Sequence, residues 1–506
     1  MSQTASGAAG PAFGLDRRLL FLALGLTAIR LLAAAAIPLT EDEAYYRLWA
    51  QHLDFGYFDH PPMVAWWIRA GSLVAGDTAL GVRLLPALAS GLNTWLIGDL
   101  ARRLGAEPRT AFRAALWYNA TLTVCLGAML AIPDAPASLF WTITLWCLAR
   151  AWPAGGTAWW LAAGVAAGLG VLSKYSALFL APGVLLWLLL IPGGLAQLKR
   201  PGPWLAALVA AALFSVNVAW NAQHGWVSFA KQFGRVAPQG LSPAHVAEFV
   251  LTQFLLLTPL IAVFAAAGVA RGLRDRRSEG GLQLMLPIAT SAPFALYLLV
   301  HSLHDRVQGH WPVPLFGALA ICAAAAAPAG GSRLSRTLGW LAPALGFAIA
   351  AATLVLAALP SAAILGPHDP LLALRGWPQF AHDVEQLRRR TGAAWVGTES
   401  YGVYAQLDKQ AQIRAPLLEV IERDRYRGGG GPAPDASQPG LIVDISRRMA
   451  VRDVGRCFAS VTAVAELARA GGVGKNQHYS AFLVAGPKRD VWTRGCPEEI
   501  RPGVWR

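Results

Sequence analysis

Residues 19–46 read LLFLALGLTAIRLLAAAAIPLTEDEAYY, an apolar run that ends abruptly in three carboxylates. The apolar part is about 20 residues long, the length of a helix that crosses a bilayer, and Arg30 is its only charge. A further acid and a histidine follow at Asp59 and His60. Because polar residues beside a membrane span are costly unless they have a task, this stretch predicts a membrane protein with chemistry at the membrane surface.

The composition places the whole chain in the same class. The 506 residues are 55% hydrophobic and only 14% charged, with a mean hydropathy of +0.42, whereas about a quarter of the residues in ordinary soluble proteins are charged. The formal net charge of +14 would point to nucleic acid in a soluble protein. In a membrane protein the same cations act as topology signals and contact anionic lipids, so we expect a polytopic membrane protein that binds no nucleic acid.

Apolar runs of spanning length recur along the first 360 residues and predict about eleven transmembrane helices. The expected spans are residues 18–38, 80–101, 111–132, 135–151, 157–172, 175–192, 203–221, 246–270, 282–301, 311–328 and 338–360. The fifth and sixth are short and follow each other closely. A re-entrant hairpin in their place, which would lower the count by two, stays open.

Lysine and arginine in the connecting segments predict the orientation. One set of alternate connections and ends contains fifteen of them: Arg17, Arg18, Arg102, Arg103, Arg109, Arg113, Arg150, Lys199, Arg200, Arg271, Arg274, Arg276, Arg277, Arg333 and Arg336. The other set contains seven: Arg47, Arg69, Arg83, Lys174, Lys231, Arg235 and Arg306. Since cytoplasmic loops carry the excess of positive charge, we expect the first set to be cytoplasmic and the acidic segment around Asp42 to face the other side.

Polar side chains recur in the connections expected on that outer side. Asp134 is flanked by two prolines, and Lys174 is alone between two apolar runs. Short loops are polar in any protein, so for a single position a solvated loop explains the residue equally well. The gathering of such groups on one face predicts one polar site, because they are costly at membrane depth unless they line a hydrated cavity.

The last part of the chain has a different texture, with shorter apolar runs and more charge. We expect a membrane domain over residues 1–360 and a small α/β domain over residues 361–506, on the outer side because an odd number of spans begins in the cytoplasm. The expected strands are Ala393–Gly397 and Gly440–Asp444, and the expected helices are Pro378–Arg390 and Arg456–Ala470.

Cysteine and motif usage narrow the chemistry. Cys457 and Cys496 are the only cysteines in the last domain, and an oxidising compartment would allow them to bond. The sequence contains no paired CxxC, no HExxH and no glycine-rich phosphate loop. Zinc hydrolase and nucleoside-triphosphate chemistry therefore have no motif behind them.

Six polar motifs occur in order between about residues 15 and 330. They are Asp42-Glu43-Ala44-Tyr45-Tyr46, Tyr57-Phe58-Asp59-His60-Pro61-Pro62, Pro133-Asp134-Ala135-Pro136, Leu172-Ser173-Lys174-Tyr175, Trp220-Asn221-Ala222-Gln223-His224 and Arg306-Val307-Gln308-Gly309-His310-Trp311-Pro312. Together they resemble the ArnT-like bacterial glycosyltransferases of the GT-C class, a group related to protein O-mannosyltransferases. The last domain resembles that family only in being a periplasmic α/β appendage.

The resemblance implies a GT-C fold and a multi-pass enzyme of the bacterial inner membrane. Such an enzyme takes a sugar from a polyprenyl-phosphate donor on the periplasmic side and transfers it to a lipid or glycolipid acceptor such as lipid A or lipopolysaccharide core. The donor class also follows from topology. Nucleotide sugars are made in the cytoplasm, so an enzyme whose carboxylates face outward needs a donor that is carried across the membrane on lipid.

The resemblance also implies roles for individual residues. The acidic residue of the family's first loop corresponds to Asp42, the general base of an inverting transfer, and Asp134 is the second catalytic candidate. Lys174 and Arg306 are the leading ligands of the donor phosphate. The substrate-binding candidates are Glu43, Tyr45, Asp59, His60, Lys174, Asn221, His224 and Arg306. Glu43 would point away from Asp42 on a helix, which favours support of the fold or of a neighbouring cation.

The sequence leaves two properties open, the identity of the sugar and the presence of a metal. Relatives that modify lipid A often have Glu-Lys-Pro where this chain has Asp59-His60-Pro61, so neither a fixed charge there nor the identity of the sugar follows. Aminoarabinose, galacturonic acid, hexosamine and mannose donors all stay open. The chemistry requires no cofactor. A divalent metal is possible, since Asp59, His60, His224, His301, His304 and His310 could supply ligands, although their spacing matches no compact metal motif.

A polytopic lipid or sugar transporter or flippase is the alternative function. It would also have many helices and buried charge. Transporters tend to have paired halves with broken helices at mid-depth, and the two halves of this sequence show no repeat. A sensor or assembly protein would explain the last domain but not the acidic segment around Asp42.

Overall fold

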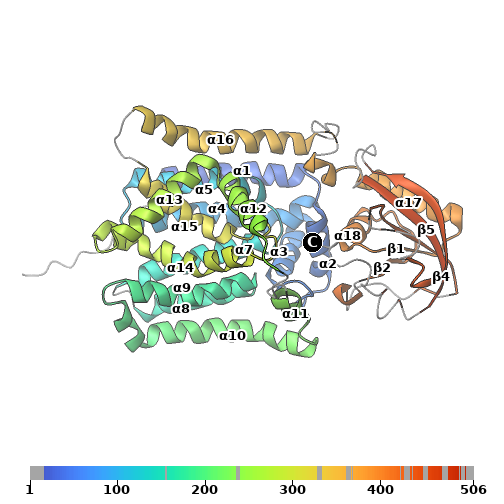
Figure 1. Cartoon of the computed structure of the whole chain (residues 1–506), viewed down its shortest axis with the longest axis horizontal. Helices are drawn as coiled ribbons and strands as arrows, with labels where there is room; N and C mark the ends of the chain where they lie inside the picture. The colour runs from blue at the N-terminus through green and yellow to red at the C-terminus, as the bar shows by residue number, and fades with distance from the viewer. Residues whose placement is uncertain are drawn as a thin grey trace, which may run out of the picture.

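The computed structural model describes residues 16–153, 156–234, 240–327, 333–359, 366, 369–421, 423–426, 434–435, 437–447, 449, 454–469, 477–488, 491 and 496. A long bundle of helices carries a small sheet-containing unit at one end (Figure 1). The helices before that unit are α1 (Arg17–Ala36), α2 (Glu41–Gln51), α3 (Met63–Ala75), α4 (Ala79–Arg103), α5 (Pro108–Ala120), α6 (Leu122–Gly127), α7 (Asp134–Ala151), α8 (Thr157–Val171), η1 (Tyr175–Phe179), α9 (Leu180–Leu190), η2 (Gly194–Lys199), α10 (Pro201–Gln223), α11 (Val227–Gly234), α12 (Pro243–Leu256), α13 (Pro259–Arg274), α14 (Glu279–His301), η3 (Val313–Leu315), α15 (Phe316–Ala326) and α16 (Arg333–Ala358).

The bundle has the lengths and composition of a membrane domain. Within the described ranges, five helices are long and apolar enough to cross a bilayer: α1, α4, α10, α14 and most of α16. The pair α12 and α13 gives a sixth if it is one span, with a bend of 104° at its break. Four shorter apolar stretches lie beside them, at Met63–Ala75, Thr157–Val171, Tyr175–Leu190 and Val313–Ala326. The chain is therefore a polytopic helical membrane protein.

Each apolar run expected from the sequence corresponds to one described helix or to a pair of them. The third run is broken at Thr121, which has extended backbone between α5 and α6. The eighth is broken at Thr258, whose φ of +68° cannot continue a helix. The fifth and sixth form separate helices with different neighbours, because α8 packs on α7 and α10 whereas α9 packs on α14.

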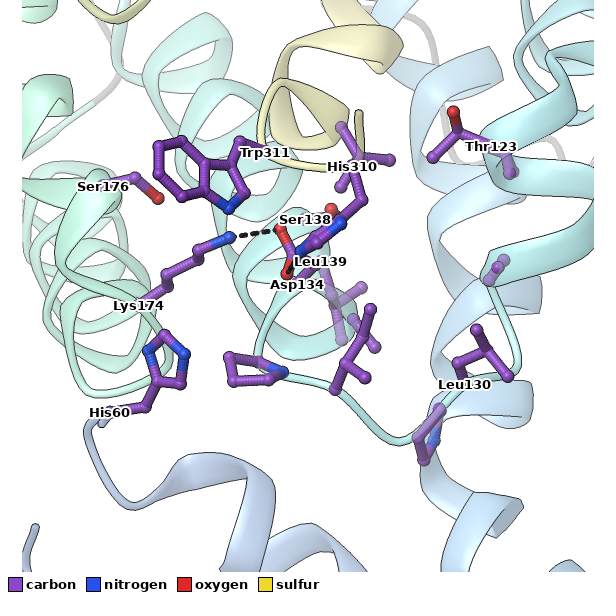
Figure 2. A pocket seen from close by; sticks show the side chains of 18 of the residues that line it. His60, Thr123, Leu130, Asp134, Ser138, Leu139, Lys174, Ser176, His310 and Trp311 are labelled. Carbon is purple, nitrogen blue, oxygen red and sulfur yellow. Dashed lines mark hydrogen bonds and ion pairs between the residues drawn. The ribbon is translucent and has the colours of Figure 1, made fainter. Parts of the chain in front are cut away.

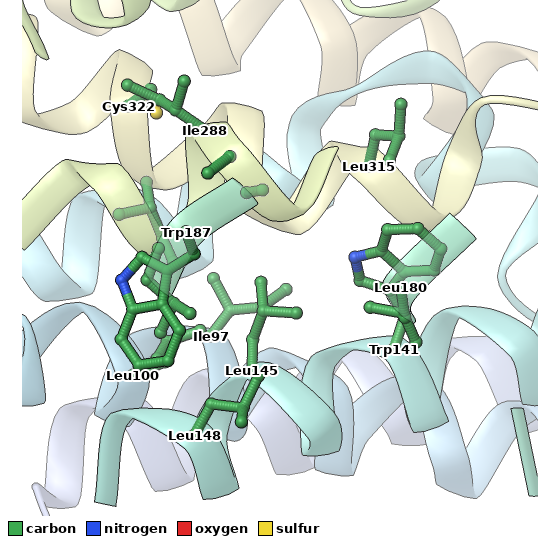
Figure 3. Close-up of a cluster of buried hydrophobic side chains, with 14 of the residues drawn as sticks. Ile97, Leu100, Trp141, Leu145, Leu148, Leu180, Trp187, Ile288, Leu315 and Cys322 are labelled. Atoms are coloured by element: carbon green, nitrogen blue, oxygen red, sulfur yellow. The ribbon is translucent and has the colours of Figure 1, made fainter. Parts of the chain in front are cut away.

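Side chains from most of the packed helices form the core of the bundle, part of which is drawn in Figure 3. Trp141 and Leu145 of α7 belong to one cluster with Leu180 and Trp187 of α9, and α4, α5, α6, α8, η1, α14, η3 and α15 add further buried residues to it. Glycine lets some of these helices approach closely: a Cβ added to Gly183 would lie 2.6 Å from the carbonyl oxygen of Thr290. Such small-residue contacts are the usual means of tight packing between membrane helices.

One buried arginine lies within the first span. Arg30 is 4% exposed. Its guanidinium donates to the Ser90 hydroxyl (3.2 Å), the Asn119 side-chain oxygen (2.8 Å) and the Val124 carbonyl (3.5 Å), all of them neutral groups. These partners belong to α4, α5 and α6. Arg30 thus ties α1 to three later helices.

The C-terminal unit, which begins at residue 369 and includes the described residues up to 496, contains a mixed five-stranded sheet in the order β2-β1-β3-β5-β4. Its elements are η5 (Pro370–Leu374), α17 (Trp377–Thr391), β1 (Trp395–Thr398), α18 (Tyr401–Gln410), β2 (Leu417–Glu419), η6 (Arg423–Tyr426), β3 (Gly440–Ile445), β4 (Phe458–Ala468) and β5 (His478–Pro487). β1 pairs in parallel with β2 and β3, and β5 pairs antiparallel with β3 and β4. A disulfide joins Cys457 to Cys496.

Three of the four elements expected in this unit are present, and one is wrong. The two expected strands and the helix at Pro378–Arg390 correspond to β1, β3 and α17. The helix expected at Arg456–Ala470 is instead the strand β4. Its alanine, glutamate and leucine favour a helix locally, but antiparallel pairing with β5 over most of its length overrides that preference.

The unit docks on the bundle through α18, which packs on α2 (Figure 1). The Gln406 side chain donates to the Leu39 carbonyl at 2.9 Å. Arg47 of α2 forms ion pairs with Asp408 of α18, at 2.8 Å, and with Asp77. These contacts fix α18 above the N-terminal end of α2.

Candidate active site

The N-terminus of α2 is fixed by a capping box and a buried ion pair. The Thr40 hydroxyl accepts from the Glu43 amide (3.2 Å), and the Glu43 carboxylate accepts from the Thr40 amide (3.0 Å). Arg83 of α4 then donates to both Glu43 oxygens at 2.6 Å. Both side chains of the pair are 0% exposed. Glu43 therefore supports the fold here and does not line the cavity described below. The sequence had not predicted α2, because its polar first turn resembles a loop.

Asp42 directly precedes Glu43 on the same turn of α2, and its side chain lies at a cavity. It lines a cavity of about 400 Å³ and accepts a hydrogen bond from the Tyr401 hydroxyl at 2.9 Å. The Asp42 side chain is exposed, but nearby protein groups displace part of the water around its carboxyl. This desolvation raises the pKa of Asp42 above its ordinary value, although the bond from Tyr401 and the proximity of His310 oppose the rise.

A second acid in the same cavity holds a lysine. Asp134, the first residue of α7, forms an ion pair with the Lys174 ammonium at 2.7 Å, and the His310 Nε2 atom lies 3.7 Å from its other oxygen. Figure 2 shows Lys174 and His310 approaching Asp134 from different elements. Burial lowers the pKa of His310 below its ordinary value, against the attraction of the Asp134 carboxylate.

The cavity combines a polar end with apolar walls. Asp42, His60, Asp134, Lys174 and His310 form the polar end. The remaining lining is mostly apolar or weakly polar and comes from α4, α6, α7 and the helices around Phe179 and Phe294. Such a cavity suits a ligand with a charged head and a hydrocarbon body.

Asp59 and Tyr45 lie beside the cavity rather than in it. The Tyr45 hydroxyl donates to the Asp59 carboxylate at 2.9 Å, and Arg425 of the C-terminal unit forms an ion pair with the same carboxylate. The Arg425 guanidinium also lies 4.8 Å from the ring centre of Tyr401. Asp59 thus joins the connection after α2 to the C-terminal unit.

Asn221 and His224, at the end of α10, also lie outside the cavity. Asn221 is 0% exposed, and its amide donates to the Asn217 carbonyl at 3.0 Å. His224 stacks on Trp220 with ring centres 4.1 Å apart. It lines a second cavity of about 560 Å³ that also contacts Arg425.

Arg306 does not lie where a ligand of the donor phosphate would have to lie. Its guanidinium pairs with Glu248 of α12 at 3.0 Å, and its side chain is 65% exposed. It does not line the cavity that contains Lys174. For metals, the described residues contain no group of three or more histidine, cysteine, aspartate or glutamate side chains that could hold an ion.

The structure therefore brings together Asp42, His60, Asp134 and Lys174 from the ten candidates, and it adds His310, Tyr401 and Arg425. His310 was within reach of the sequence, because it stands in one of the six motifs. Tyr401 and Arg425 were not. They are 359 and 366 residues from their partners Asp42 and Asp59, and nothing local marks such contacts.

Comparison with known proteins shows which proteins this chain is similar to. Residues 59–220 match the dolichyl-phosphate-mannose-protein mannosyltransferase family. The lipid A galacturonosyltransferase RgtD of Rhizobium johnstonii is 28% identical over 309 residues, which are 60% of this chain and 64% of that protein. The chain is thus similar in sequence to ArnT-like glycosyltransferases of the GT-C class.

Two further ArnT-like proteins show how far the likeness extends. An undecaprenyl phosphate-alpha-4-amino-4-deoxy-L-arabinose arabinosyl transferase of Pseudomonas fluorescens is 32% identical over 187 residues, 34% of this chain and 32% of its own length. ArnT from Cupriavidus metallidurans, in a crystal structure with undecaprenyl phosphate, has the same fold: the TM-score is 0.61 at 18% identity, over 94% of this chain and 100% of that one. The sequence matches to the Rhizobium johnstonii and Pseudomonas fluorescens relatives each cover less than two thirds of the length of that relative.

Proposed function

We propose that this ArnT-like protein is an inner-membrane glycosyltransferase. It moves a sugar from a polyprenyl-phosphate donor to an acceptor at the periplasmic face, such as lipid A or lipopolysaccharide core. The observation that carries the proposal is that Asp42, with a raised pKa, and the Lys174 ammonium line one cavity. A base for the acceptor and a cation for the donor phosphate are the two groups that this reaction needs.

The donor class is supported by the cavity walls and by the relatives. A polyprenyl chain fits among apolar helices, while its phosphate fits the polar end where Lys174 lies. The Pseudomonas fluorescens relative is named for an undecaprenyl phosphate sugar, and the Rhizobium johnstonii relative for lipid A and galacturonic acid. The first name agrees with a lipid-linked sugar donor, and the second supports lipid A as the acceptor.

The positions of the side chains support the following course of reaction. Asp42 removes the proton from the acceptor hydroxyl or phosphate as that oxygen forms a bond to the anomeric carbon. The bond between this carbon and the phosphate oxygen breaks, and the electron pair leaves with the lipid phosphate, so the configuration inverts. Lys174 stabilises the negative charge on the departing phosphate. Asp134 holds Lys174 and His310 in place.

We further propose about eleven spans, with the cavity and the C-terminal unit on the periplasmic side. Three observations support this orientation. Fifteen of the counted lysines and arginines belong to one set of connections against seven in the other. The connections that line the cavity belong to the set with seven. The disulfide between Cys457 and Cys496 is typical of an oxidising compartment.

The test replaces the base while keeping its shape. Asp42→Asn should lower transfer at least about a hundredfold, the usual contribution of a general base, while thermal unfolding in detergent stays unchanged. The assay uses purified protein, a polyprenyl-phosphate sugar and lipid A, and Glu41→Gln on the same helical turn is the matched control. Near-normal turnover by Asp42→Asn would overturn the assignment. A wild-type protein that never depletes the donor but moves lipid across vesicles would favour the transporter.

A further inference from the structure

One side chain of the C-terminal unit, that of Tyr401, contacts Asp42, the proposed base. Tyr401, the first residue of α18, donates its hydroxyl hydrogen to the Asp42 Oδ1 atom at 2.9 Å. Its ring lies 4.8 Å from that of Tyr45, and the Arg425 guanidinium lies over the same ring. This hydrogen bond engages the Oδ1 atom of the Asp42 carboxylate.

Two polar contacts hold α18, and with it Tyr401, against the bundle. Gln406 binds the Leu39 carbonyl, one residue before the cap of α2, and Asp408 pairs with Arg47 of α2. Gly402 follows Tyr401, and a Cβ at this glycine would come within 2.5 Å of the Glu41 carboxylate. A side chain at position 402 would therefore crowd Glu41, and the glycine permits the close approach of α18 to α2. The close approach brings the Tyr401 hydroxyl within reach of Asp42.

We propose that Tyr401 is a positioning residue for the transfer reaction: the C-terminal unit supplies the hydroxyl that orients Asp42 and sets the pH range in which it acts as a base. The proposal rests on the proposed function, in which Asp42 takes the acceptor proton. It gives the C-terminal unit a part in the chemistry, beyond that of a periplasmic appendage.

The direction of the effect follows from the groups that face Asp42. They are Tyr401 from α18, His310 from the connection after α14, Asp59 from the connection after α2, and Glu43 and Tyr46 from α2 itself. Burial and the two acids favour the protonated carboxyl, whereas Tyr401 and His310 favour the carboxylate. A hydroxyl that donates to a carboxylate stabilises the charged form, so its loss makes Asp42 harder to ionise.

The experiment is a pH–rate profile of Tyr401→Phe in the full-length protein. A base works only when it is deprotonated, so kcat/KM falls as the pH drops through its pKa. Without the hydroxyl this acid limb should move upward by about one pH unit, and the rate should recover toward the wild-type value at high pH. Replacing Tyr401 with 3-fluorotyrosine, whose hydroxyl is a stronger donor, should move the limb downward.

Tyr479→Phe is the matched control, because its hydroxyl accepts from Arg469 at 2.8 Å, whereas the Tyr401 hydroxyl donates to Asp42. It should leave the acid limb unchanged. A Tyr401→Phe profile with an unmoved limb, or a loss of rate that is equal at every pH, would overturn the positioning role while leaving Asp42 as the base. Turnover by Asp42→Asn would instead overturn the proposed function. If Tyr401→Phe fails to fold, the fluorotyrosine shift decides the question.

Discussion

Two acid–base pairs lie near the same end of the bundle, and they are built differently. In the Glu43–Arg83 pair both side chains are 0% exposed, and the guanidinium also donates to the Ile37 and Pro38 carbonyls. In the Asp134–Lys174 pair the side chains are 5% and 12% exposed, and both face the cavity. The first pair is closed to ligands, whereas the second leaves an ammonium within reach of one. The environment around a charge pair, more than its distance, separates a structural pair from a functional one.

The largest effect on stability is expected when the acid of the closed Glu43–Arg83 pair is removed. Glu43→Gln leaves Arg83 charged and buried without its counter-ion, so we expect a loss of about 3–5 kcal/mol in the free energy of unfolding. Unfolding in detergent, with Glu41→Gln as the control on the same turn, measures it. Unchanged stability with weakened substrate binding would return Glu43 to the substrate-binding group in which the sequence placed it.

The matching change in the open pair is Lys174→Met. We expect the KM for the lipid-phosphate donor to rise at least about tenfold, since a charged hydrogen bond to phosphate is lost. The melting temperature should fall much less than in Glu43→Gln, because Asp134 still faces the cavity and His310. The double variant with Asp134→Asn should bring the melting temperature back toward the wild-type value. A drop in melting temperature with donor affinity intact would show that both pairs are structural.

The smallest effect is expected for Arg306→Gln. Its pair with Glu248 is a surface ion pair, and such pairs contribute less than about 1 kcal/mol. Transfer rates and the donor KM should therefore change by less than about twofold, within the range of a surface substitution. The same assays apply, with Glu248→Gln as the partner control. A tenfold rise in the donor KM would instead support the phosphate role expected from the sequence.

The sequence predicted the helices of the bundle well because spanning length and hydropathy are sums over many residues. It missed α2 and α3, since the first is polar and the second has only 13 residues. The breaks at Thr121 and Thr258 also escaped it, because a β-branched residue inside an apolar run gives no hint of extended or positive-φ backbone. The composition of the β4 segment favours a helix, but antiparallel pairing with β5 makes it a strand.

The site was predictable where one polar residue interrupts apolar sequence. Asp134 and Lys174 stood out in this way, and the structure places both in the cavity with Asp42. Arg306 had the same appearance, yet its chain segment lies on the surface beside α12. Contacts from the C-terminal unit could not be foreseen, because Tyr401 reaches Asp42 only after the whole chain has folded.

Arg30 has a consequence for how the protein is made. A central arginine adds about 2.5–3.5 kcal/mol to the cost of inserting a span. The groups that solvate its guanidinium, on Ser90, Asn119 and Val124, are synthesised after α1 has already left the ribosome. The leucines around Arg30 carry α1 into the bilayer, since its mean hydropathy is 2.2. We therefore expect α1 to settle at its final depth only once α4, α5 and α6 have inserted beside it, so the first helix to be made is not the first to be fixed.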